Sequence, residues 1–248
     1  MKAMNRKEGF TLVELLVVIG ILGILSAALF PAIGSAVLKA NMTSVATRGK
    51  DLYVAIVGAN TEREPLGLGH VWPRATLGTT DANDPITQNF TTSSEYFTKL
   101  MDMEKKGTDD WAPYVQGIDA SKLAGAGVKA LPANQKTITK EYNMWTIAGD
   151  IIDEMEDIIP IFVTRNIDEA PGKLFITSGA GQQPSVERQA KWWKDGADFK
   201  SPFNNKGFVM VRKGGATLSL SSRYVSQDII YSSQTVSLGS PGIKYLIP

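Results

Sequence analysis

Hydrophobic residues are most concentrated near the start of the chain, where no charged residue occurs from Leu15 to Leu38. A helix of about 24 residues is about 36 Å long at ~1.5 Å per residue, which is enough to cross the hydrocarbon core of a bilayer. Glu14 is a lone carboxylate at the head of this run. Because an ionisable side chain costs on the order of 2.5–3.5 kcal/mol near the bilayer centre, we expect Glu14 to have a function that offsets this cost.

The pattern becomes amphipathic near Leu38, with apolar residues at steps of three and four and polar residues between them. It predicts that the helix continues to about Asn60 and stops at Glu62-Arg63-Glu64-Pro65. The whole helical segment, residues 10–60, would be about 75 Å long by the same rise. The stripe expected to pack on a globular domain consists of Val37, Leu38, Met42, Val45, Leu52, Tyr53, Ile56 and Val57.

The remainder, residues 61–248, has the length of one globular domain. Its short apolar segments, separated by Gly and Pro, predict short strands and a helix at Glu95–Met103. The clearest hairpin is Phe208–Leu220, with Gly214-Gly215 as its turn. Further strands are predicted at Tyr142–Ile147, Pro160–Thr164, Lys173–Thr177, Ile229–Tyr231 and Ile243–Ile247, and a second helix at Ile151–Ile158. The predicted fold class is α+β, with the long helix packed on a small antiparallel sheet.

Basic residues precede the apolar run and predict its orientation. Lys2, Arg6 and Lys7 would stay on the cytoplasmic side, which places the rest of the chain outside. A secretory signal peptide is the alternative, because Ser26-Ala27-Ala28 offers small residues for cleavage. The apolar run is too long for that class and continues through these residues, so we favour a retained helix.

The residues around Gly9 carry a family resemblance. A short basic leader is followed by Gly9, then by Phe10, and then by Glu14 at the fifth position after Gly9. This segment resembles the prepilin signal of type IV pilins and type II secretion pseudopilins. Gly23 and Pro31 also match positions where many pilins have helix-weakening residues. The resemblance covers about 30 residues and is highly specific, whereas the rest of the chain is similar only in architecture.

The resemblance implies a processing pathway and a set of partners. A prepilin peptidase would remove residues 1–9 by cutting between Gly9 and Phe10, and would N-methylate Phe10. The mature chain would be a single-pass inner-membrane protein with a cytoplasmic N-terminus, and would then enter a periplasmic pseudopilus or a cell-surface filament. Its partners would be copies of itself, other pilins and an inner-membrane assembly platform. Glu14 would set the axial register by pairing with the Phe10 amine of a neighbouring subunit.

Net charge gives no reason to expect a nucleic-acid partner. The full chain has a formal net charge of +1, and loss of a leader with three basic side chains and one acidic side chain changes it by −2, to −1. A strong basic excess, the usual mark of proteins that bind nucleic acids or anionic lipids, is therefore absent from the mature sequence.

Candidate cofactor and catalytic residues are few. The chain has no cysteine, so no disulfide can close its C-terminal part. We expect no cofactor, and a calcium ion is an open alternative without named ligands. Acidic clusters occur at Asp81–Asp84, at Asp109-Asp110 and between Asp150 and Asp157, and a solvated surface is the favoured interpretation of each. We expect His70 to be a loop residue, and core or contact roles for Trp72, Trp111, Trp145, Trp192 and Trp193.

These observations favour a structural protein over an enzyme. The first choice is a type II secretion pseudopilin, because many type IV pilins close a C-terminal loop with a disulfide and this chain has none. A type IV pilus subunit for adhesion, motility or DNA uptake is the second choice. A third possibility is a membrane-anchored binding or enzymatic domain that does not polymerise.

Overall fold

The computed structural model describes residues 10–78, 85–105, 119–151, 155–166, 202–221 and 244–248. These residues belong to two compact units, Met1–Ala40 and Asn41–Pro248, and each unit is described by itself. The strands predicted at Lys173–Thr177 and Ile229–Tyr231 lie outside the described residues.

Helix α1, Leu12–Arg63, is the longest element and contributes residues to both units. It continues without interruption through Gly23 and Pro31. Its end at Arg63 lies slightly beyond the predicted end at Asn60. A short 3-10 helix, η1 (Glu64–Leu66), follows, and Gly67 with a φ of 69° closes it by donating its N–H to the Glu64 carbonyl at 3.0 Å. The left-handed conformation at Gly67 is the usual way to end a helix.

The second unit contains a five-stranded antiparallel sheet of order β4-β3-β2-β1-β5. Its strands are β1 (Trp145–Gly149), β2 (Pro160–Thr164), β3 (Phe208–Arg212), β4 (Thr217–Leu220) and β5 (Lys244–Leu246). The long helix and the antiparallel sheet confirm the predicted α+β fold class. The strands predicted at Pro160–Thr164 and Ile243–Ile247 and the hairpin at Phe208–Leu220 are also confirmed.

The three central strands are buried on both faces. Every residue of β1 and β2 is buried, and only the last residue of β3 is partly accessible. These strands are rich in β-branched and aromatic residues and read as continuous apolar runs, as expected for strands covered on both sides. The edge strand β4 alternates between exposed and half-buried positions.

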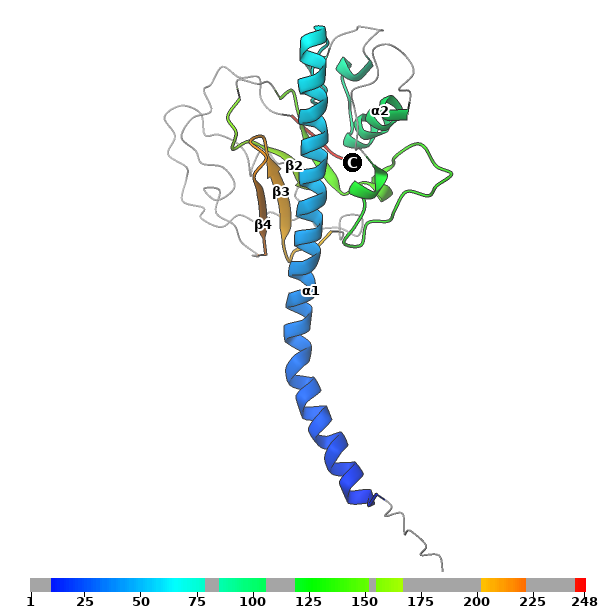
Figure 1. The fold of residues 1–248 in the computed structure, drawn as a ribbon, viewed down its shortest axis with the longest axis vertical. Helices are drawn as coiled ribbons and strands as arrows, with labels where there is room; N and C mark the ends of the chain where they lie inside the picture. Colours follow the sequence, from blue (N-terminus) through cyan, green and yellow to red (C-terminus); the bar gives the residue numbers. More distant parts are fainter. Residues whose placement is uncertain (1–9, 79–84, 106–118, 152–154, 167–201, 222–243) are drawn as a thin grey trace, which may run out of the picture. The chain divides into compact units, whose positions relative to one another are not determined.

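The second half of α1 crosses one face of this sheet (Figure 1). Gly49 is the closest point: a Cβ atom built there would lie 2.8 Å from the Trp145 ring and 2.8 Å from a methyl group of Val211. The absence of a side chain at this position therefore allows the helix to approach the sheet closely. Residues of the predicted stripe that are buried in this contact region are Met42, Val45, Leu52 and Ile56.

Helix α2, Ser93–Lys105, packs on the sheet as well and confirms the predicted helix at Glu95–Met103. The Phe97 ring stacks on Phe162 of β2, with ring centroids 6.5 Å apart. The Ser93 hydroxyl donates to the Trp145 carbonyl of β1 at 2.7 Å. Three further 3-10 helices lie at Pro85–Thr87 (η2), Ala120–Lys122 (η3) and Lys140–Tyr142 (η4).

The helix predicted at Ile151–Ile158 is not found: of its described residues, Met155, Asp157 and Ile158 lie in bends or turns, and Ile151 and Glu156 have no regular structure. The predicted hairpin turn forms, but of Gly214 and Gly215 only Gly215 has a positive φ, at 77°. The Gly214 N–H instead donates to the Asp157 carbonyl at 2.9 Å, which ties the turn to the segment before β2.

Candidate processing and assembly site

The N-terminal end of α1 is closed by a capping box formed by Thr11 and Glu14. The Thr11 N–H donates to Glu14 Oε2 at 2.9 Å, and the Thr11 hydroxyl donates to the same oxygen at 2.8 Å. In return, the Glu14 N–H donates to Thr11 Oγ1 at 3.3 Å. Since the helix begins at Leu12, Thr11 is its N-cap and Glu14 is its third residue, the positions of a capping box. The carboxylate predicted to act in assembly is therefore held by its own chain.

This capping role was not predicted, although the spacing Thr-x-x-Glu before an apolar run signals it. The same spacing recurs at the start of α2. There the Glu95 N–H donates to Thr92 Oγ1 at 3.1 Å, and the Thr92 N–H donates to Glu95 Oε2 at 3.3 Å. A hydrogen bond from the Thr91 hydroxyl, at 2.6 Å, is the main reason that the pKa of Glu95 lies below its usual value.

The apolar side chains of the first part of α1 are exposed in the single chain. Phe10 is 83% exposed and Leu12 is 79% exposed. The mean hydropathy of this part reaches 2.6, and none of the segment is buried. By length and composition, α1 is the one described helix that could cross a membrane. So much apolar surface needs lipid or protein to cover it.

The predicted site residues fall into two groups along α1. Phe10 and Glu14 lie together at its N-terminal end, whereas Gly23 and Pro31 lie farther along the helix. Gly9 lies outside the described residues. A Cβ atom at Gly23 would meet nothing within 4 Å, so packing within the single chain does not require a glycine there. Pro31 has no N–H to donate to the carbonyl of Ala27, so one hydrogen bond of the helix is missing there. Its role in weakening the helix stays a prediction.

No metal site is formed by the residues that the structure describes. No group of three or more His, Cys, Asp or Glu side chains among them is arranged to hold an ion. The clusters at Asp81–Asp84 and Asp109-Asp110, and Asp153 with Glu154, lie outside the described residues. A calcium ion therefore stays an untested alternative.

Asp150 is buried, which corrects the prediction of a solvated acidic surface at this position. Its Oδ1 accepts the Ala75 N–H at 2.8 Å and the Leu77 N–H at 3.0 Å. Its Oδ2 accepts the Thr76 hydroxyl at 2.7 Å and the Thr76 N–H at 3.0 Å. Burial raises the pKa of Asp150, but these hydrogen bonds together outweigh it, so the pKa lies below its usual value. The carboxylate thus anchors the loop 75–77 to the end of β1.

We expect the Asp150→Asn variant to lose about 1–3 kcal/mol of stability at neutral pH, because an amide cannot accept all of these bonds. The lowered pKa also gives a sign for the pH dependence. The contribution of Asp150 is fully present above the pKa of an unfolded Asp, about 3.9, and is lost as pH falls through the lower folded pKa. Urea titrations of the full chain in detergent give the free energy of unfolding at pH 7 and at pH 3. The difference between these two free energies should be smaller for Asp150→Asn than for the wild type. An equal difference would contradict this assignment.

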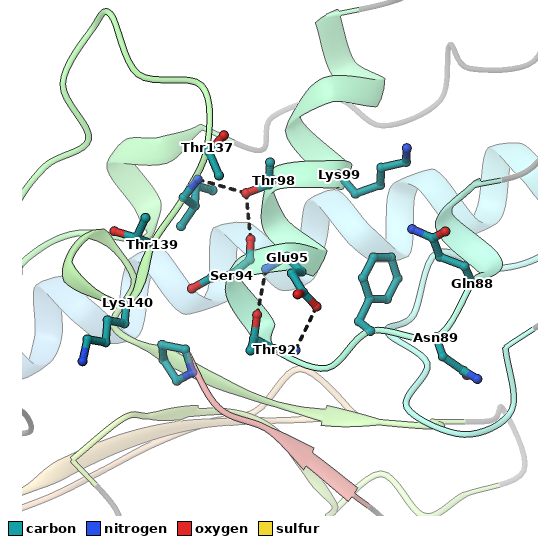
Figure 2. A pocket seen from close by; sticks show the side chains of 13 residues that line it. Gln88, Asn89, Thr92, Ser94, Glu95, Thr98, Lys99, Thr137, Thr139 and Lys140 are labelled. Atoms are coloured by element: carbon teal, nitrogen blue, oxygen red, sulfur yellow. Dashed lines mark hydrogen bonds between the residues drawn. The ribbon is translucent and has the colours of Figure 1, made fainter.

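A groove of about 480 Å³ lies beside the N-terminal end of α2. Figure 2 shows its walls, which come from α2, from the segment around Asn89 and from the loop that carries Thr137 and Thr139. The Thr98 hydroxyl joins two of these walls by donating to the Ser94 carbonyl at 2.8 Å and accepting the Ile138 N–H at 2.9 Å. Hydroxyl, amide, ammonium and carboxylate groups line the groove, together with the apolar side chains of Phe90, Ile138 and Pro248.

A second hollow, of about 730 Å³, lies near the C-terminal end of α1 and includes His70, the single histidine of the chain. His70 Nε2 lies 3.5 Å from Arg74 Nη2. The setting fits the predicted loop residue.

The described tryptophans have core roles, as predicted. Trp145 is fully buried, and its indole N–H donates to the Lys122 carbonyl at 3.0 Å. Trp72 is also buried, with its ring 6.3 Å from that of Tyr53. The remaining tryptophans, Trp111, Trp192 and Trp193, lie outside the described residues.

Comparison with known proteins identifies the N-terminal segment. A family model described as the prokaryotic N-terminal methylation motif matches residues 4–30. This motif is the prepilin-type signal of type IV pilins and pseudopilins, which confirms the resemblance predicted from Gly9, Phe10 and Glu14. No curated protein and no solved structure matches the chain. The motif supports a type IV pilin-like or pseudopilin subunit, and with the apolar helix it indicates membrane anchoring.

Proposed function

We propose that this chain, which carries the prepilin-type signal, is a structural subunit that polymerises into a type II secretion pseudopilus. The observation that carries the proposal is the position of Glu14. It is the lone carboxylate at the head of an exposed apolar helix, inside the matched motif. In a helix that served only as a membrane anchor, a carboxylate in the apolar run would make insertion less favourable and would bring no benefit.

Processing would create the partner for this charge. Cleavage between Gly9 and Phe10 releases an ammonium group one helical turn from Glu14. In a filament whose apolar helices pack together, both groups lose water, and a desolvated carboxylate is tolerated only with a cation beside it. Pairing between Glu14 of one subunit and the Phe10 amine of the next would therefore select one axial register among many equivalent apolar contacts.

The membrane would serve as a store of subunits before assembly. Lys2, Arg6 and Lys7 would keep the N-terminus cytoplasmic, and α1 would cross the bilayer once. On entering a filament, the exposed apolar side chains would exchange lipid contacts for contacts with neighbouring helices. Small residues such as Gly20, Gly23 and Ala27 allow the close approach that such packing needs.

Two features bear on the choice of machine. The chain contains 0 cysteines, whereas many type IV pilins close their C-terminal loop with a disulfide. This difference favours the secretion pseudopilus, and a type IV pilus subunit is the alternative. In either case we propose a structural role, with prepilin peptidase, the inner-membrane platform and other pilins as partners.

The test uses the lack of natural thiols. Two cysteines introduced at Leu22 and Ile24, which are 56% and 73% exposed and lie on opposite sides of the helix, would be the only thiols of the chain, and each could react with a different neighbour. Treating cells with a bifunctional maleimide should then give, beyond the monomer, a ladder of cross-linked chains if α1 packs against its copies. A ladder confined to the envelope fraction supports a pseudopilus, and a ladder in sheared surface filaments supports a pilus. Monomers alone in both fractions would contradict polymerisation and leave a membrane anchor.

A further inference from the structure

We infer that the second hollow, near the C-terminal end of α1, binds an uncharged oligosaccharide. The inference does not rest on the proposed polymerisation, since every residue that lines the hollow belongs to the second unit. The walls come from the last turns of α1 around Asn60, from the loop 67–72, and from Asp157 with the turn at Lys213-Gly214. The volume of about 730 Å³ lies within the ~300–1,000 Å³ typical of small-molecule sites, so the hollow has room for more than a single ion.

The lining offers hydrogen-bond donors and acceptors together. Glu64 is exposed and the side chain of Asp157 is 81% exposed, so both carboxylates can accept bonds from a ligand. The Asn60 amide adds a donor group, the NH₂ beside the oxygen that accepts the Val71 N–H at 2.7 Å. A sugar hydroxyl donates one hydrogen bond and accepts others, so it is matched by this mixture, whereas an inorganic ion needs groups of one kind only.

The charges of the hollow nearly cancel. Lys213 Nζ lies 3.8 Å from the Asp157 carboxylate and donates to the Met155 carbonyl at 2.8 Å. Glu64 adds one further negative charge, so the lining has no positive excess that would attract an anion. Among the described residues, no three acidic or histidine side chains are grouped to hold a metal ion. An uncharged ligand is therefore the class that this lining favours.

Two aromatic rings give the hollow an apolar wall. Tyr53 and Trp72 both line it, and their ring centroids are 6.3 Å apart. Tyr53 is the ring that a ligand can reach, since it is partly accessible and Trp72 is buried. A sugar ring has faces of C–H groups that pack on an aromatic side chain, while the hydroxyls at its edge bond to polar groups. Apolar and aromatic lining with a few convergent polar groups is the usual composition of a ligand site.

The walls are held in place before a ligand arrives. The buried Arg63 donates from Nε to the Gly69 carbonyl at 2.7 Å, and the Leu68 N–H donates to the Arg63 carbonyl at 3.2 Å. In the other wall, the Gly214 N–H donates to the Asp157 carbonyl at 2.9 Å. Since binding does not have to order these segments, less of the interaction free energy is lost.

Calorimetric titration of the full chain tests the inference. The chain is kept in a detergent without a sugar headgroup, and the probes are cellotriose, maltotriose and triacetylchitotriose. We expect saturable binding of at least one of them. Replacing both Glu64 and Asp157 by alanine should weaken that binding by at least about 10-fold, because hydrogen bonds to charged groups are the stronger kind.

Two further variants make the result specific to the hollow. Glu62→Ala is the matched control, because Glu62 is an exposed glutamate of α1 outside the lining, and it should bind like the wild type. Thr61→Trp keeps both carboxylates and places a large ring at the exposed lining position 61, so it should also lose binding. Urea unfolding of each variant shows that it is folded under the conditions of the titration.

Three outcomes would overturn the inference. One is that the folded wild type binds none of the three sugars. Another is that the Glu64→Ala/Asp157→Ala double variant or Thr61→Trp binds as tightly as Glu62→Ala. The third is binding of argininamide in place of the sugars, which would assign the hollow to a cationic group of a protein partner. A chain that forms the cross-linked ladder without binding sugar would leave the proposed function intact and remove this inference alone.

Discussion

Replacing Glu14 by alanine is expected to lower filament assembly by at least about 100-fold while membrane insertion is unchanged. Removing one partner of a desolvated ion pair leaves the other charge unpaired, which typically costs ~3–5 kcal/mol. Insertion should not suffer, because the substitution makes the apolar run longer and removes its lone charge. The measurement is the amount of assembled chain relative to the processed chain in the membrane, determined by quantitative immunoblotting.

Glu62 supplies the matched control, since it is an exposed glutamate of the same helix outside the apolar run. Glu62→Ala should assemble at the wild-type level. Normal filament amounts in the Glu14→Ala variant would show that Glu14 does not pair during assembly. Equal losses in both variants would show that the effect is not specific to the N-terminal end of α1.

The second large effect concerns the contact between α1 and the sheet. We expect Gly49→Ala to destabilise the second unit by about 1–2 kcal/mol, although alanine is the better helix former by about 1 kcal/mol. The added methyl group would lie 2.8 Å from both the Trp145 ring and Val211, which a real Cβ atom does not tolerate. Forcing extra atoms into a packed core typically costs ~1–3 kcal/mol. The helix would have to move away from the strands that it covers.

Gly58 on the same helix is the control, because a Cβ atom there would meet nothing within 4 Å. Gly58→Ala should therefore stabilise the protein by about 0.5–1 kcal/mol through helix propensity alone. Urea unfolding of the full chain in detergent, followed by the fluorescence of its tryptophans, compares the two variants. Shifts of the same sign would mean that the close approach at Gly49 does not limit the packing.

Local patterns made the helix and the signal predictable from the sequence. The uncharged run, the lone Glu14 and the residues around Gly9 occupy adjacent positions, so their meaning does not depend on the rest of the fold. The same holds for the hairpin at Phe208–Leu220, whose strands are neighbours in sequence. The capping box of Thr11 and Glu14 is equally local, because its Thr-x-x-Glu spacing lies directly before the apolar run.

Long-range contacts account for what was not predicted. Nothing near Asp150 in the sequence shows that its carboxylate holds the loop 75–77, because the bonded residues are more than 70 positions away. The tight contact at Gly49 depends on Trp145 and Val211 in the same way. The helix predicted at Ile151–Ile158 is not found in the described residues of that segment, which follow the anchored Asp150.

The mass of the N-terminal peptide of the mature chain tests the central claim most directly. Envelope and sheared-filament fractions would be digested and searched for the peptide that contains Phe10. The account predicts a chain that begins at N-methylated Phe10 and is recovered together with its cross-linked copies. A chain that still carries residues 1–9 in every fraction would contradict the account, because the amine that Glu14 needs would never be formed.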